Sequence, residues 1–227
     1  MKKNILLILV IILLTGFLRL PYVYEKILNP DEATYAVVAR EILNGKLIYR
    51  DIIDMKPPFG HILFMLGEIF NKGNSLFGIH LIGLFWVILT TIVLIKTGNY
   101  IYGNSKGYIT GFLYTIFSMS YYSYDMVAVN LELLMVLPLS LSFLFFSYYL
   151  VKKNTNYLFL SALMTGLSFL FKQTGIYNFF PILLIYWFII YKSKKFSLKE
   201  VINTSFLTIS GFLLPFLISL IFFTLKG

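Results

Sequence analysis

The chain has 227 residues, of which 59% are hydrophobic and 13% charged, whereas soluble domains have about 25% charged residues. With a mean hydropathy of +0.82, a soluble fold of this size has no way to bury its apolar side chains. The absence of cysteine excludes disulfides, thiolate metal ligands and a cysteine nucleophile, so we predict an integral membrane protein that uses none of these.

The first predicted element is the apolar segment Ile5–Phe17, which follows Lys2 and Lys3. A cleaved signal peptide has an apolar core of similar length, but small residues should mark its cleavage site. Arg19-Leu20-Pro21-Tyr22 follows instead. We therefore expect a retained membrane span that begins in the cytoplasm.

The next segment, residues 22–75, is the longest polar stretch and is predicted to form the first extracytoplasmic loop. Within it, Asn29-Pro30-Asp31-Glu32 is typical of a helix start, with Asn as N-cap and Pro at the first helical position. Asn44-Gly45 is a stop signal. The run Pro57–Phe70 is apolar but short and contains Glu68, so we expect a helix that lies along the membrane surface.

Six further apolar segments are candidate spans, since a spanning helix needs roughly 20 mostly apolar residues. They are Leu76–Ile95, Tyr108–Tyr124, Val127–Leu150, Tyr157–Phe171, Ile176–Tyr191 and Val201–Leu225. Together with the first span they predict an all-α, polytopic membrane helical bundle of about seven spans, with amphipathic interfacial helices in the first external loop.

The charges test this threading, because cytoplasmic loops carry an excess of lysine and arginine. With the N-terminus inside, ten lysines fall on the cytoplasmic side, accompanied by one acid, Glu200. These lysines are Lys2, Lys3, Lys96, Lys106, Lys152, Lys153, Lys192, Lys194, Lys195 and Lys199. The net charge of +9 therefore indicates orientation, and no nucleic-acid partner is needed to explain it.

Two parts of the external loop are candidates for chemistry. Asp31 and Glu32 occupy the first turn of the predicted helix, and Tyr35 lies on one face of it. Acids there stabilise the helix dipole, which is the simpler interpretation, but a helix start also holds a carboxylate as a base or metal ligand requires. In Lys56-Pro57-Pro58 the prolines hold the lysine at the membrane surface, where it contacts either a lipid phosphate or any head group.

Further polar residues are predicted at the same face. Asp125 ends the third span, and Asn130 and Glu132 begin the next. An ionisable group in a span costs roughly 2.5–3.5 kcal/mol, so it is a functional candidate. Lys172 occupies a tight outer turn opposite these carboxylates, which suits a phosphate, although a lysine that reaches for head groups fits equally well.

Asp31-Glu32-Ala33-Thr34-Tyr35-Ala36, followed by Lys56-Pro57-Pro58, resembles the first-loop signature of the GT-C glycosyltransferases. The similarity is greatest to protein O-mannosyltransferases and lipid A aminoarabinose transferases, and residues 166–172 resemble a later turn of that group. The resemblance implies that Asp31 is the catalytic base or a metal ligand, with Glu32 beside it. It also implies that Lys56 contacts the lipid-linked phosphate and that Asp125 is a second acid.

The resemblance implies transfer of a sugar from a polyprenyl-phosphate donor to a protein, lipid or glycan on the extracytoplasmic face, with inversion. We expect Lys172 to bind the donor phosphate with Lys56, and Asn130, Glu132 and Tyr35 to support the site. A Mg²⁺ or Mn²⁺ ion between Asp31 and Asp125 is left open. Relatives are longer, so we expect residues 1–227 to form one domain, the membrane core, without a C-terminal region.

Two alternatives belong to other classes. One is a catalytically inactive fragment or subunit of such an enzyme. The other is a small lipid or solute transporter, whose charged residues should lie near the bilayer midplane on broken helices. The charged candidates here gather at one membrane face instead, which favours the glycosyltransferase.

Overall fold

The structure, a computed structural model, describes residues 2–25, 29–71, 76–103, 106–119, 127–192 and 197–226. Within these ranges the regular structure is helical, apart from one isolated β-bridge between Ile48 and Ile52. The elements are α1 (Lys2–Val23), α2 (Pro30–Leu43), α3 (Pro58–Glu68), α4 (Phe77–Tyr102), α5 (Lys106–Phe117), α6 (Leu131–Lys152), α7 (Thr155–Phe171), the 3₁₀-helix η2 (Gln173–Asn178), α8 (Phe179–Lys192) and α9 (Leu198–Lys226). The predicted all-α fold is confirmed.

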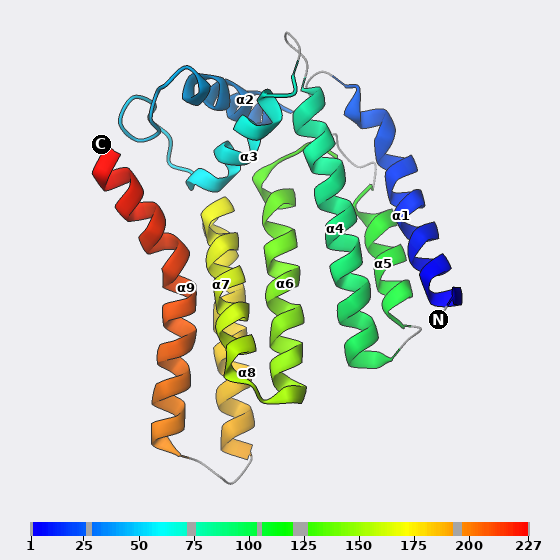
Figure 1. The fold of residues 1–227 in the computed structure, drawn as a ribbon, viewed down its shortest axis with the longest axis vertical. Coiled ribbons are helices and arrows are strands. Elements are labelled where there is room, and N and C mark those ends of the chain that lie inside the picture. Colours follow the sequence, from blue (N-terminus) through cyan, green and yellow to red (C-terminus); the bar gives the residue numbers. More distant parts are fainter. Residues whose placement is uncertain are drawn as a thin grey trace.

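The helices form a bundle with a cap at one end. Helices α1 and α4 to α9 run roughly along the long axis, and α2 and α3 lie across one end of it (Figure 1). We call α2, α3 and the connecting residues 44–57 the cap, and residues 44–57 alone the strap. The last residues of α4, α6 and α8 and the first residues of α5, α7 and α9 lie at the opposite end (Figure 1). Lys106, Lys152 and Lys192 stand at these helix ends, so these lysines and the cap occupy opposite ends of the bundle, as the alternating threading requires.

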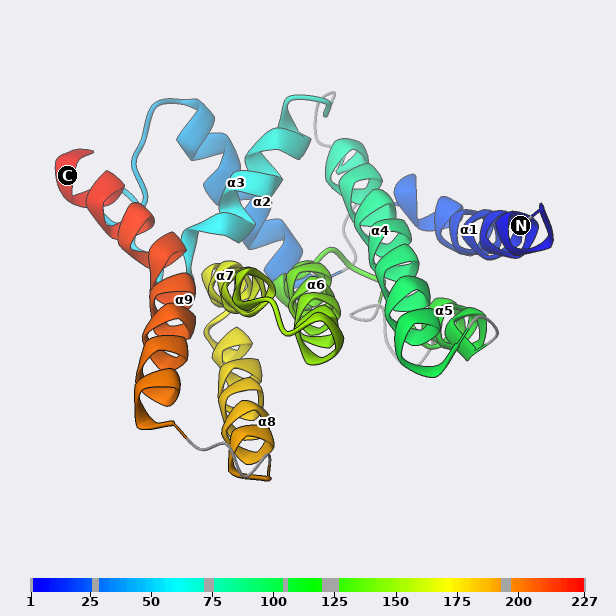
Figure 2. The same cartoon turned by 60° about the horizontal axis from the view of Figure 1, so that its bottom comes forward.

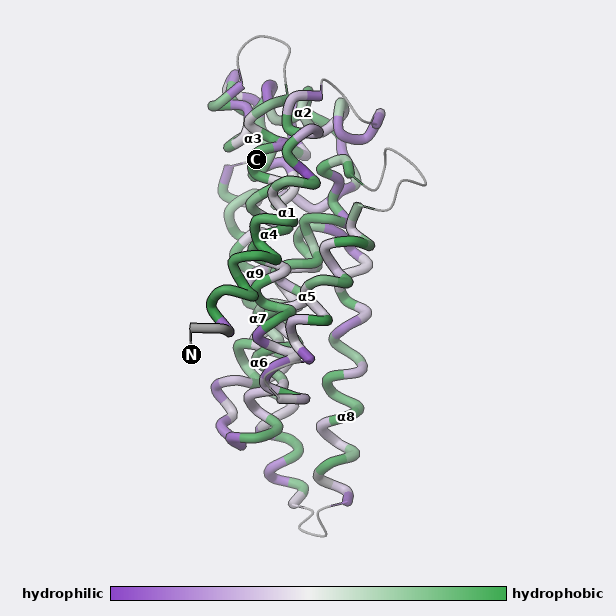
Figure 3. The backbone as a smooth tube through the Cα atoms, turned by 90° about the vertical axis from the view of Figure 1, so that its right-hand side faces the viewer, coloured by the Kyte–Doolittle hydropathy of each residue, from purple (hydrophilic) through white to green (hydrophobic). Residues whose placement is uncertain are grey.

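Length and composition identify the bundle as a membrane domain. In the described part of the chain, α1, α4, α6 and α9 are each long and apolar enough to cross a bilayer, while α7 and α8 are apolar but shorter. Hydrophobic residues colour most of the bundle, and hydrophilic ones gather at the cap (Figure 3). The chain is therefore a multi-pass membrane protein. A count of seven spans stays a prediction.

Several predicted boundaries shift for local reasons. The short run after the strap folds as a separate helix in the cap, as predicted. Helix α6 begins at Leu131 instead of residue 127, because Asn130 is its N-cap and accepts a hydrogen bond from the Leu133 N–H at 2.9 Å. The sixth predicted span begins with η2, so its α-helical part starts at Phe179. Helix α5 ends at Phe117, short of the predicted Tyr124.

Helix α7 packs between α6 and α9 (Figure 2). It approaches α9 at Gly166, where a Cβ would collide with the carbonyl oxygen of Phe212. It meets α6 through a buried hydroxyl network in which Ser142 Oγ lies 2.8 Å from Thr165 Oγ1 and 3.1 Å from Ser161 Oγ. Small residues and hydroxyls of this kind hold membrane helices together where the hydrophobic effect does not.

Candidate active site

Local sequence signals place Asp31 at the tip of α2. The Asn29 side chain accepts a hydrogen bond from the Glu32 N–H at 2.8 Å, and Pro30 occupies the first helical position, so the predicted helix start is confirmed. The buried face of α2 packs on α3, with the rings of Tyr35 and Phe64 in edge contact at 5.3 Å. The Asp31 side chain remains 62% exposed, so it is accessible to a ligand.

The strap holds Lys56 by its backbone. The Lys56 N–H donates to Asp54 Oδ1 at 3.0 Å, and the Tyr49 hydroxyl donates to the Lys56 carbonyl oxygen at 2.7 Å. Pro57 and Pro58 then fix the extended entry into α3. The lysine side chain is directed toward α2, where it meets Tyr35.

Three side chains from the two predicted motifs form one group, which we call the Asp31–Tyr35–Lys56 cluster. Lys56 Nζ donates to the Tyr35 hydroxyl at 2.8 Å and lies 4.4 Å from the centre of its ring. The Tyr35 hydroxyl donates in turn to Asp31 Oδ2 at 3.4 Å, and Lys56 Nζ is 3.8 Å from Asp31 Oδ1. A base candidate and a phosphate-binding candidate therefore lie side by side, bridged by a phenol.

The surroundings keep this phenol protonated. Burial raises the pKa of Tyr35 above its ordinary value, and the nearby carboxylates of Asp31 and Glu132 raise it further. Tyr35 therefore remains a hydrogen-bond donor to Asp31 throughout the physiological pH range. Its role is to hold the carboxylate and the ammonium of Lys56 in a fixed relation.

His61 lies beneath the cluster and was not predicted to belong to it. Its ring is fully buried, and Nε2 is 2.9 Å from Asp54 Oδ2, a close contact whose geometry is not that of a hydrogen bond. The ring meets the edge of Tyr35 at 5.6 Å. Burial lowers the pKa of His61, with the positive charge of Lys56 acting in the same direction and Asp54 opposing it. His61 therefore supports the strap as a neutral ring.

The carboxylate of Glu32 points away from the cluster. It is buried, and its Oε1 accepts hydrogen bonds from His80 Nε2 and from the Val129 N–H, both at 2.9 Å. This arrangement connects α2 to α4 and to the segment before α6. The structure places Glu32 in contacts with α4 and Val129, and its predicted catalytic role stays a prediction. His80 is a second residue that the motifs did not indicate.

The remaining predicted residues that the structure describes lie at the same end of the bundle. Lys172 forms an ion pair with Glu132, and both side chains are partly exposed. Gln173 Nε2 donates to the Met55 carbonyl oxygen at 2.8 Å, so the turn that carries Lys172 is tied to the strap. Asn130 serves as the N-cap of α6. Asp125 falls outside the described residues.

Asp31 is the one described residue of the metal site suggested by the sequence. Nowhere in the described ranges do three or more histidine or acidic side chains gather as a metal would require. Asp31 faces the ammonium of Lys56, and a divalent cation beside that group would be repelled. Asp125, the other ligand predicted for Mg²⁺ or Mn²⁺, lies outside the described residues, so the metal site stays a prediction.

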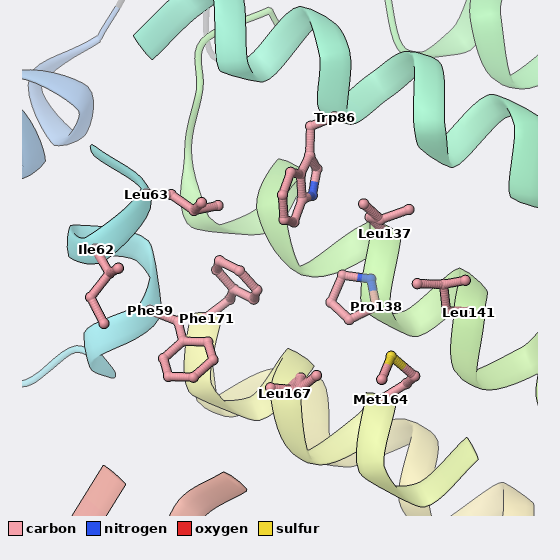
Figure 4. A pocket seen from close by; sticks show the side chains of 10 residues that line it. All are labelled: Phe59, Ile62, Leu63, Trp86, Leu137, Pro138, Leu141, Met164, Leu167 and Phe171. Atoms are coloured by element: carbon pink, nitrogen blue, oxygen red, sulfur yellow. The ribbon is translucent and has the colours of Figure 1, made fainter. Parts of the chain in front are cut away.

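Two grooves open next to the cap. The inner groove, of about 350 Å³, lies between α3, α4, α6 and α7, and its lining is wholly apolar (Figure 4). It is lined by Phe59, Ile62, Leu63, Trp86, Leu137, Pro138, Leu141, Met164, Leu167 and Phe171. The strap groove, of about 270 Å³, lies between the strap, the end of α7 and α9. Its lining combines apolar residues with Lys56, Gln173 and Ser219.

Comparison with known proteins identifies the family. A family model described as dolichyl-phosphate-mannose-protein mannosyltransferase matches residues 55–223, from the end of the strap to the end of α9. The match includes Lys56 but begins after Asp31, and no curated protein or solved structure matches the chain. It confirms the resemblance to GT-C glycosyltransferases and implies a polyprenyl-phosphate-linked sugar donor. With most of its length covered, the chain belongs to the dolichyl-phosphate-mannose-protein mannosyltransferase family.

Proposed function

We propose that this protein transfers a sugar from a polyprenyl-phosphate donor to an acceptor hydroxyl at the cap, on the extracytoplasmic face of the membrane. One observation carries the proposal: the Asp31–Tyr35–Lys56 cluster joins an accessible carboxylate to an ammonium group at the edge of an apolar groove. The carboxylate can activate the acceptor. The ammonium group can bind the phosphate of the donor, and the groove can hold its lipid chain.

The strap groove suits the donor better than the inner groove does. A polyprenyl phosphate has a charged head on a hydrocarbon chain, and the strap groove has Lys56 in an otherwise largely apolar wall. The inner groove is larger but has no charged lining residue. Lys172 is a second cation near the strap and pairs with Glu132, but Lys56 is the lysine that lines the strap groove itself. We therefore assign the phosphate to Lys56.

The reaction is a direct displacement. Asp31 accepts the proton of the acceptor hydroxyl while the oxygen of that hydroxyl forms a bond to the anomeric carbon. The bond between that carbon and the phosphate oxygen breaks on the opposite side, its electron pair stays on the phosphate, and the configuration inverts. General-base assistance of this kind contributes about 10²–10⁴-fold. Lys56 stabilises the charge that develops on the leaving phosphate.

The distribution of charge supports the extracytoplasmic location. Lys106, Lys152 and Lys192 stand at helix ends opposite the cap (Figure 1). Because lysine-rich segments favour the cytoplasmic side, this arrangement supports a cap on the other face.

Transfer from a radiolabelled polyprenyl-phosphate mannose into acceptors of the host membrane tests the function. We expect Asp31→Asn to lose about 10²–10⁴-fold in rate, because the amide cannot accept the proton. Asp51→Asn is the matched control, since Asp51 is also an exposed acid of the cap but is paired with Arg50. Equal transfer by the wild type and Asp31→Asn would overturn the proposal.

A further inference from the structure

His80 is a buried histidine that the proposed chemistry does not use. It lies in the first turn of α4, is 4% exposed, and places Nε2 2.9 Å from Glu32 Oε1. Glu32 Oε1 is a hydrogen-bond acceptor here, so the ring tautomer with the proton on Nε2 completes the contact. The same oxygen also accepts the Val129 N–H at 2.9 Å. Helix α4 and the segment before α6 thus both contact Glu32 Oε1 of α2.

We propose that His80 is a positioning residue for Asp31 and acts through Glu32; the inference rests on the proposed role of Asp31 as the base. Asp31 and Glu32 are neighbours in the first turn of α2. Successive residues of an α-helix project about 100° apart. Fixing Glu32 toward the bundle therefore fixes the direction in which Asp31 projects, which is toward Lys56.

The partners of Glu32 are themselves held in place. Helix α4 runs so close to the segment before α6 that a Cβ at Gly83 would collide with the Val129 side chain. The Val129 N–H and the His80 ring are therefore presented to Glu32 from one rigid surface. An apolar residue in place of His80 would leave a buried carboxylate with one of these two donors removed, and the first turn of α2 would move to recover hydrogen bonds.

Steady-state kinetics of the full chain provide the first test. We expect His80→Leu to lower kcat between about tenfold and a hundredfold, because a misplacement of 1 Å costs up to about 10² in rate. The KM for the donor should stay within about threefold, since Lys56 binds the phosphate and keeps its own backbone contacts. His80→Gln places an amide N–H where Nε2 lies and should retain most of kcat.

Thr97→Val is the matched control. Thr97 is also buried in α4, where its hydroxyl donates to the Val93 carbonyl oxygen at 2.8 Å, but it lies far along the helix from the cap. A loss of kcat that followed general destabilisation would appear in both variants. A wild-type kcat in His80→Leu would overturn the proposal. If His80→Leu does not fold, His80→Asn replaces it, because its shorter amide does not reach Glu32 as the ring does.

A second measurement needs no activity. Because the chain has no cysteine, Asp31→Cys with Lys56→Cys gives a unique thiol pair for a short bifunctional thiol reagent. We expect His80→Leu to lower the yield of cross-link several-fold and His80→Gln to leave it unchanged. An unchanged yield in His80→Leu would contradict the positioning role. If Asp31→Asn transfers sugar normally, the proposed function fails, while the cross-link still reports whether His80 orients this helix.

Discussion

Lys56 Nζ lies 3.8 Å from Asp31 Oδ1, although the two residues belong to separate motifs at the start of α2 and at the end of the strap. The Tyr35 hydroxyl contacts both groups. This triangle joins the two motifs of the external loop into one site.

We expect the ammonium of Lys56 to stabilise the negative charge that develops on the phosphate as it leaves. Lys56→Met retains a chain of similar length that still packs beside Tyr35, but it removes the charge. We expect transfer to fall by about 10²–10³-fold, the loss typical of removing one group that stabilises developing negative charge. Initial rates at saturating donor measure this loss. Lys46→Met is the control, since Lys46 is a cap lysine paired with Glu41, and equal rates for the two variants would exclude this role of Lys56.

The Tyr35 hydroxyl is expected to align the cluster without reacting. Tyr35→Phe keeps the buried ring and its contact with Phe64 but removes the bridge between the carboxylate and the ammonium. We expect kcat to fall about tenfold, which corresponds to the loss of one hydrogen bond to a charged group. Tyr157→Phe, at the opposite end of the bundle, loses a comparable contact with Lys152 and should keep its rate. A Tyr35→Phe variant with full activity would show that the bridge is dispensable.

The two grooves are distinguishable by filling them separately. Ser219→Trp places a bulky ring in the strap groove, and Leu141→Trp does the same in the inner groove. If the donor chain binds in the strap groove, Ser219→Trp raises the donor KM at least tenfold because the added ring occupies its volume. Leu141→Trp leaves the donor KM near the wild-type value. The opposite pattern would move the donor to the inner groove.

The pH dependence of stability should contain a contribution from His61. Its ordinary pKa of 6.5 is lowered in the folded chain, so the unfolded chain binds a proton at a pH where the folded chain does not. Stability from this residue is therefore complete above about pH 6.5 and is lost as the pH falls toward the lower folded value. We expect the unfolding temperature, followed by tryptophan fluorescence in detergent, to fall between about pH 7 and pH 5. In His61→Gln the fall should be smaller, and identical pH profiles would contradict the assignment.

Local signals in the sequence predicted the cap well. Asn29, Pro30 and Asn44-Gly45 set the two ends of α2, because capping depends on residues adjacent in the chain. The apolar run after the strap was correctly separated from the bundle, since its inclusion as a span would have reversed the lysine distribution. The placement of Asp31 and Lys56 at one face followed from the same threading.

Long-range partners were not accessible in this way. Histidines 61 and 80 lie in apolar stretches, and their partners Asp54 and Glu32 become evident only when α2, α3 and α4 pack together. The pairing of Lys172 with Glu132 likewise depends on how α6 and α7 meet. For Glu32, however, a signal was present. Neighbouring residues on a helix point about 100° apart, so Glu32 is directed away from the side on which Asp31 lies.

The close packing of α7 on α9 at Gly166 bears on which donor lipids the proposed strap groove can accept. The backbones of α7 and α9 cannot separate or slide without losing this contact. The side of the strap groove that these two helices form therefore has a fixed width. The opposite side of the groove is the strap, which meets α9 through the ring contact of Tyr49 with Phe223 at 5.0 Å and meets η2 through the hydrogen bond from Gln173 to the Met55 carbonyl oxygen. A thicker or differently branched donor lipid therefore requires the strap to move. We expect changes in the sequence of the strap to alter which donor lipids fit the groove.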